Sequence, residues 1–198
     1  MQSVIIVDFQ KDFTRPFGKA FVPRPCVPFI QNTIIPTIQR DGWGLFSIVS
    51  DYRLPRPGDE HELCVPGTVG FREDIDPDTL ARLRSPLRKW VKAMNSPSWI
   101  RENGGVMGFP TYEPYPDPDK FIDWCDATFT PRESIALIGL TVDCCVLCTA
   151  MELSYQGYHP VVVSDATDAY DGTKETKDAA LRVISNWAEV KTSKQVFG

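Results

Sequence analysis

The stretch that decides the fold is Ser134-Ile135-Ala136-Leu137-Ile138-Gly139-Leu140-Thr141-Val142-Asp143-Cys144-Cys145-Val146-Leu147-Cys148-Thr149-Ala150. Its apolar first part is typical of a buried strand, and the apolar side chains after the paired cysteines recur at helical spacing. The stretch therefore predicts a strand, a sharp turn and a helix whose N-cap is Asp143. Cys145 falls in the first helical turn, where unpaired backbone N–H groups and the helix dipole favour an anion. We expect this thiol to have a depressed pKa and to act as a nucleophile.

Size and composition favour a single α/β domain over residues 1–198. The chain is 42% hydrophobic and 24% charged, which is ordinary for a soluble globular protein. Its formal net charge of -5 is spread without long runs, so we expect no nucleic-acid or membrane partner. No signal peptide and no apolar run of membrane-spanning length is evident. The 6 cysteines lack the spacing of a zinc module, so we expect reduced thiols in a cytoplasmic protein.

Strand-like and helix-like segments alternate along the chain. Strands are expected over 3–7, 45–50, 87–91, 134–139 and 160–165 and around Val190, and helices over 27–40, 77–83, 119–125, 145–156 and 174–187. Pro36 should kink the first of these helices or end it early. The alternation predicts a mostly parallel sheet covered by helices on both faces. The polar, proline-rich segments 52–76 and 93–118 are expected to be site loops, and the second of them to form a lid or rim.

Four polar residues directly follow predicted strands. Asp8, Asp51, Lys92 and the turn that carries Cys145 all fall at carboxyl ends, where sites form in sheets of this kind. A cysteine nucleophile needs a base that takes its proton and returns it to a leaving group. Asp8 is suited to that task, and Lys92 is suited to stabilise the charges of both partners.

Four motifs, in this order, resemble those of the isochorismatase-like cysteine hydrolases. This superfamily includes nicotinamidases, N-carbamoylsarcosine amidohydrolases and ureidoacrylate amidohydrolases. Residues 8–13 resemble its D-x-Q-x-D-F opening, and residues 67–70 match G-T-x-G. Residues 91–99 resemble its K-x-x-x-S-x-F segment, with Trp99 where phenylalanine is usual. Residues 139–150 resemble G-x-x-T-D-x-C-V-x-x-T-A, with Val142 in place of threonine.

The resemblance implies a three-layer, six-stranded, mostly parallel sheet and a catalytic triad of Asp8, Lys92 and Cys145. It also implies a non-proline cis peptide bond before Thr141, which aims the amides of Thr141 and Cys145 at a developing oxyanion. A homo-oligomer and a small-molecule substrate are further implications. Phe13 and Trp99 are expected to form walls around that substrate, with an ordinary core role as the alternative.

The chain departs from its metal-dependent relatives at the metal site. Their D-x-H pattern reads Asp51-Tyr52-Arg53 here, their H-C pair reads Leu63-Cys64, and the nearby His61 is out of register. We therefore expect no metal and no other cofactor, and a site made from Asp51 and His61 stays an open alternative. Arg53 is suited to bind a substrate carboxylate bidentately, unless it is a solvated loop residue.

These patterns predict a cysteine-dependent amidohydrolase that cleaves a C–N bond of a small amide or ureide through a Cys145 thioester. One alternative is an isochorismatase-type vinyl-ether hydrolase, and another is a metal-dependent nicotinamidase. A third is a non-catalytic interaction protein. An intact set of Asp8, Lys92 and Cys145 argues against the first and third of these alternatives.

Overall fold

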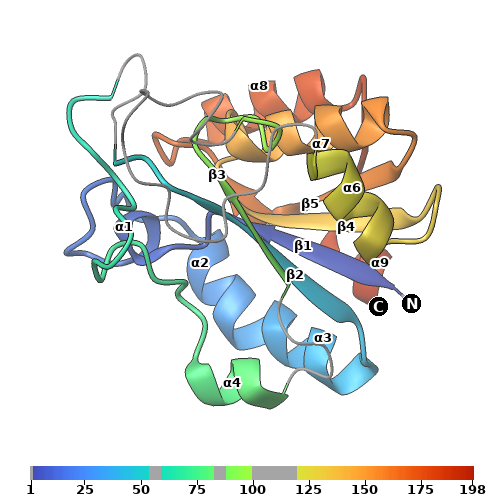
Figure 1. Cartoon of the computed structure of the whole chain (residues 1–198), viewed down its shortest axis with the longest axis horizontal. Helices are drawn as coiled ribbons and strands as arrows, with labels where there is room; N and C mark the ends of the chain where they lie inside the picture. Colours follow the sequence, from blue (N-terminus) through green and yellow to red (C-terminus); the bar gives the residue numbers. More distant parts are fainter. Residues whose placement is uncertain (1, 54–58, 83–87, 100–119) are drawn as a thin grey trace.

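The computed structural model describes residues 2–53, 59–82, 88–99 and 120–198, and over these residues it confirms the predicted α/β fold (Figure 1). One six-stranded sheet has the order β3-β2-β1-β4-β5-β6. All of its strand pairs are parallel. The strands are β1 (Ser3–Val7), β2 (Gly44–Ser50), β3 (Arg88–Lys92), β4 (Ser134–Leu140), β5 (His159–Asp168) and β6 (Glu189–Lys191). Each lies within a few residues of its predicted place.

Helices cover both faces of the sheet (Figure 1). Helices α2 (Cys26–Phe29), α3 (Ile35–Asp41) and α9 (Ser193–Phe197) contribute to one hydrophobic cluster. Helices α6 (Lys120–Thr128), α7 (Cys145–Tyr155) and α8 (Lys174–Ile184) contribute to the other. Two short helices, α1 (Lys11–Thr14) and α4 (Pro77–Arg82), flank the sheet. Strands β1 and β2 are buried along their whole length, which is why their sequences are mostly continuous apolar runs rather than alternating ones.

The predicted effect of Pro36 takes a different form from a kink or an early end. The helical run passes from α2 through a π-helical segment, Ile30–Ile34, into α3, where Pro36 lies in the first turn. A proline has no N–H and its ring clashes with the carbonyl four residues earlier. Pro36 avoids the missing hydrogen bond and the clash because it lies in the first turn of α3 and follows the wider π-helical turn. The helix therefore continues to Asp41.

The order of the strands reverses between β1 and β4, which lie side by side at the centre of the sheet. Gly139 allows their close approach, because a Cβ there would lie 2.2 Å from the Val7 carbonyl oxygen and its φ of 105° suits glycine. The carboxyl ends of these strands flank the crevice where open α/β sheets bind ligands.

Among the described residues, the helices all lack the length and apolar character that crossing a membrane requires. Most of the predicted lid, 93–118, lies outside the described residues, which include only 93–99 of it.

Candidate active site

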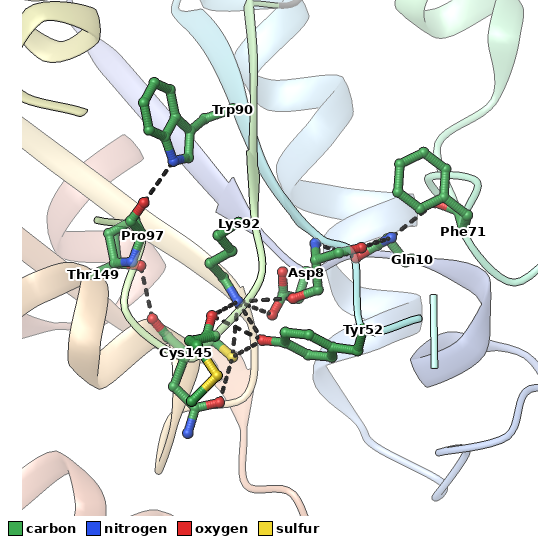
Figure 2. Close-up of polar contacts among 12 residues, drawn as sticks. Asp8, Gln10, Tyr52, Phe71, Trp90, Lys92, Pro97, Cys145 and Thr149 are labelled. Carbon is green, nitrogen blue, oxygen red and sulfur yellow. Dashed lines mark hydrogen bonds and ion pairs between the residues drawn. The ribbon is translucent and has the colours of Figure 1, made fainter. Parts of the chain in front are cut away.

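Side chains from four neighbouring strands meet at the carboxyl edge of the sheet (Figure 2). Asp8 directly follows β1, Lys92 ends β3, and Cys145 begins α7 after β4. Tyr52 lies two residues beyond the end of β2. The structure thus brings together the three residues of the predicted triad, although 84 residues separate Asp8 from Lys92 and 53 separate Lys92 from Cys145.

The Lys92 ammonium is the centre of this cluster. Its Nζ lies 2.9 Å from Asp8 Oδ2 and 3.2 Å from Cys145 Sγ. It also lies 2.8 Å from Ser50 Oγ, 2.6 Å from Tyr52 Oη and 3.1 Å from the Met94 carbonyl oxygen. Lys92 and Asp8 are almost completely buried, with side chains 0% and 1% exposed. Burial by itself would lower the pKa of Lys92, but Asp8 and Cys145 raise it above its ordinary value, so the amine is charged.

The two carboxylate oxygens of Asp8 differ in their contacts. Its Oδ2 accepts from Lys92, whereas its Oδ1 is buried and has no hydrogen-bond partner among the described residues. A buried carboxylate oxygen without a donor is costly, so such an atom is a strong candidate to receive a proton during a reaction.

The predicted electrostatics of Cys145 are wrong in direction. Burial raises the pKa of this thiol to about 12, Asp8 adds to the rise, and Lys92 and Tyr52 oppose it. The helix-end effect that led us to expect a depressed pKa is small beside the cost of ionising a sulfur that is 3% exposed. This upward shift of the pKa favours the neutral thiol, from which a base removes the proton.

The predicted helix cap is also wrong, although Cys145 does open the helix. The N-cap of α7 is Cys144, without a side-chain cap. Asp143 instead accepts a hydrogen bond from the Tyr170 amide at 3.0 Å, because its backbone is still in the turn. This contact ties the cysteine turn to the end of β5.

Two backbone amides beside Cys145 are available to an anion. The peptide bond between Leu140 and Thr141 is cis, where the resemblance placed such a bond. The Thr141 carbonyl accepts from the amides of Cys144 and Val146. The amides of Thr141 and Cys145 themselves have no backbone acceptor among the described residues. The prediction that these two groups form an oxyanion hole matches this pattern.

Residues of the first motif hold the surroundings in place. The Gln10 side chain donates to the Ser50 carbonyl at 3.0 Å and accepts from the Ser50 amide at 2.8 Å, which fixes the end of β2. Asp12 accepts from the Cys64 amide at 2.7 Å. A Cβ on Gly70 would collide with this carboxylate, so the glycine of the G-T-x-G motif makes room for it. Asp12 therefore orders a loop.

Sequence reasoning missed three groups that contact the reacting side chains. They are the hydroxyls of Ser50 and Tyr52, both within 2.8 Å of Lys92 Nζ, and the Asn95 side-chain oxygen, 3.6 Å from Cys145 Sγ. A signal for two of them exists in the sequence. Positions 50 and 52 share one face of an extended chain, whereas positions 51 and 53 share the other. The motif comparison assigned roles only to Asp51 and Arg53.

A metal does not fit the Asp51 position. Asp51 is fully buried, and its two oxygens accept from Arg53 Nε at 3.0 and 2.8 Å. The Arg53 Nη2 atom also pairs with Asp51 Oδ2, and the arginine side chain is only 8% exposed. The guanidinium is therefore not the solvated alternative. Its predicted role with a substrate carboxylate stays a prediction, since a carboxylate of the protein already engages it.

His61 does not belong to a metal-binding group among the described residues. No group of three or more histidine, cysteine, aspartate or glutamate side chains in the described part of the chain has metal-binding geometry. His61 is exposed and lines a surface cavity of about 320 Å³ together with Lys19 and Tyr170.

The two predicted substrate walls differ in their surroundings. Phe13 is 3% exposed and belongs to the hydrophobic cluster beneath α2 and α3, which agrees with the core alternative. Trp99 is 47% exposed, and its backbone closes the loop after Lys92 through a bond from the Ala93 amide. Trp99 thus stays a candidate for contact with a ligand.

Comparison with protein families supports the predicted resemblance. Residues 120–195, which contain the cysteine turn, match the model of the isochorismatase domain. No curated protein sequence is similar enough to this chain to count as a match.

Solved structures extend the similarity over the whole chain. A nicotinamidase/pyrazinamidase from Bacillus subtilis superposes with a TM-score of 0.68 at 19% identity, covering 96% of this chain and 100% of its own. A pyrazinamidase from Pyrococcus horikoshii, determined in complex with zinc, gives 0.68 at 19% identity, covering 96% and 98%. An N-carbamoylsarcosine amidase from Thermoplasma acidophilum gives 0.63 at 22% identity and covers both chains completely. The predicted six-stranded fold is the fold of these proteins.

Proposed function

Because the chain has the isochorismatase-like fold along its length and matches the isochorismatase domain over residues 120–195, we propose that it is a cysteine-dependent amidohydrolase. It cleaves a C–N bond of a small amide or ureide, with Cys145 as nucleophile, Asp8 as general acid and base, and Lys92 as the fixed cation between them. The proposal depends above all on one observation, the position of Lys92 Nζ within 3.2 Å of both the Asp8 carboxylate and the Cys145 sulfur.

Acylation follows from this arrangement. Asp8 takes the proton of the Cys145 thiol, and the thiolate attacks the carbonyl carbon of the substrate. The developing oxyanion accepts from the amides of Thr141 and Cys145. The C–N bond then breaks, and Asp8 gives its proton to the departing nitrogen. Ammonia or an amine leaves, and the acyl group remains on the sulfur as a thioester.

Hydrolysis of the thioester restores the enzyme. Asp8, again a carboxylate, takes a proton from a water molecule as that water attacks the thioester carbon. The C–S bond breaks, and the sulfur leaves as a thiolate beside the Lys92 ammonium. Asp8 returns its proton to the sulfur, and the carboxylic or carbamic acid product departs.

The test is a panel of small primary amides, ureides and carbamoyl compounds, with ammonia release as the readout. The reaction is quenched with acid during turnover and the intact mass is measured. We expect at least one compound to release ammonia and to leave an acyl adduct that peptide mapping places on Cys145. Ammonia release that persists after complete alkylation of Cys145 would contradict the proposal. Pyruvate release from isochorismate without an adduct would favour the vinyl-ether hydrolase.

Chelation is expected to leave the activity unchanged. The Asp51 carboxylate, which is the equivalent of a metal ligand in the motif of metal-dependent relatives, is engaged by the Arg53 guanidinium. The measurement is the rate of ammonia release after dialysis against a strong zinc chelator, with total metal measured by mass spectrometry. A loss of activity that added zinc restores would show that a metal takes part.

A further inference from the structure

Tyr52 lies within the catalytic centre although no motif marks it. Its side chain is fully buried, and its hydroxyl end points toward Lys92, whose Nζ lies 5.0 Å from the ring centroid (Figure 2). Its hydroxyl oxygen lies 2.6 Å from Lys92 Nζ, 3.4 Å from Cys145 Sγ and 3.1 Å from the Met94 carbonyl oxygen. A phenol hydroxyl is therefore in contact with the reacting sulfur and with the cation that stabilises it.

The contacts of Lys92 determine which way this hydroxyl donates. A charged ammonium only donates, so the Tyr52 oxygen accepts from Lys92, and its own proton must go elsewhere. Among the described residues, the acceptors in reach include Met94 O and Cys145 Sγ. Met94 O also lies 3.1 Å from Lys92 Nζ, so one of the three ammonium protons is able to point to it when the tyrosine turns away. The hydroxyl proton is free to move from one acceptor to the other.

The charge of the sulfur decides between these acceptors. A neutral thiol or a thioester sulfur is a weak acceptor, whereas a hydrogen bond to an ionised group is about twice as strong as a neutral one. When Cys145 is protonated or acylated, the carbonyl of Met94 is the better acceptor for Tyr52. When Cys145 is a thiolate, the sulfur is the better acceptor.

We propose that Tyr52 is a further residue of the catalytic centre, whose hydroxyl turns from the Met94 carbonyl to the Cys145 sulfur when the thiolate forms and turns back when the sulfur is acylated. This inference rests on the proposed cysteine chemistry and adds a second, neutral donor to the ammonium of Lys92. It gives the thiolate two donors, from β3 and from the end of β2, and stabilises the ionised form relative to the thiol.

The pH dependence of Cys145 involves every ionisable group that faces it in the described residues. Asp8 opposes the ionisation of Cys145, whereas Lys92 and Tyr52 favour it. The thiol of Cys64 also lies close enough to interact with Cys145. Burial is the largest contribution and raises the pKa of Cys145. Removing the Tyr52 hydroxyl takes away one of the two favourable groups, so the pKa of the thiol should rise further.

The experiment is alkylation of Cys145 by iodoacetamide, measured by intact mass and peptide mapping across a range of pH in the wild type and in Tyr52→Phe. We expect the variant to react about tenfold more slowly below the wild-type midpoint, with its midpoint roughly one pH unit higher. Because burial raises the pKa of Cys145 to about 12, neutral and mildly alkaline conditions lie below both midpoints, and the ratio of the two rates should stay constant across them. A purely structural defect would not be reversed by a stronger donor, whereas 3-fluorotyrosine at position 52 should make Cys145 react faster than in the wild type.

Tyr158→Phe is the matched control. Tyr158 is also buried, at 4% exposed, and its hydroxyl donates to Asp126 at 2.7 Å, away from the site. Its loss should leave the alkylation profile unchanged. If Tyr52→Phe does not fold, 3-fluorotyrosine at position 52 provides the opposite change, because its more acidic hydroxyl is a stronger donor and should lower the midpoint.

The outcomes separate this inference from the proposed function. A reactive Cys145 with identical profiles in the wild type and in Tyr52→Phe would overturn the role of Tyr52 and leave the cysteine mechanism intact. A wild-type Cys145 that iodoacetamide does not modify at any pH would overturn both.

Discussion

The replacement of Cys145 by alanine is expected to abolish turnover, with kcat falling at least about 10⁴-fold, because removal of a nucleophile removes the covalent pathway itself. The acyl adduct seen by intact mass should disappear with the activity. The fold should survive, since alanine fills most of the space of a small thiol and its backbone amide is unchanged. The measurements are steady-state ammonia release and the intact mass of quenched reactions.

Cys148→Ala is the matched control for this prediction. Cys148 lies three residues further along α7, is half-buried, and burial raises the pKa of its thiol as well. Its loss should change kcat little. Retained activity in Cys145→Ala, or its loss in Cys148→Ala, would mean that the nucleophile has been assigned to the wrong cysteine.

The second large effect is expected from Lys92→Met, which should lower both stability and activity. Methionine fills the space of the lysine stem but leaves the Asp8 carboxylate, 1% exposed, without its cation. Breaking a buried pair in this way costs about 3–5 kcal/mol of the free energy of unfolding. The Cys145 thiolate also loses its closest donor, so ammonia release should become undetectable. The measurements are urea unfolding and the substrate panel.

The double variant Asp8→Asn/Lys92→Met separates the two losses. With the carboxylate replaced by a neutral amide, most of the lost stability should return. Activity should not return, because the double variant has neither the base nor the cation. A double variant as unstable as Lys92→Met would show that Lys92 stabilises the fold through contacts other than the one with Asp8.

The predicted triad agrees with the observed cluster because the topology of a parallel sheet brings these three residues together. Continuous apolar runs identify strands buried on both faces, and parallel strands bring their carboxyl ends to one edge. Asp8, Lys92 and Cys145 each stand at such an end, so their meeting needed only the strands to be right. The short helices α1 and α9 were not predicted, because 4 or 5 residues carry too little periodicity to be recognised.

The sequence by itself determined the order of the strands along the chain, the parallel sheet, and the edge at which the polar residues gather, because these depend on local apolar patterns. Only the tertiary structure decided how those residues behave. Burial of Cys145 reverses the expected shift of its pKa, Arg53 engages the carboxylate of Asp51, and the Tyr52 hydroxyl lies against the sulfur. Each of these depends on which atoms surround a group in space and on how little water reaches it. The residues next to that group along the chain determine neither of these two properties.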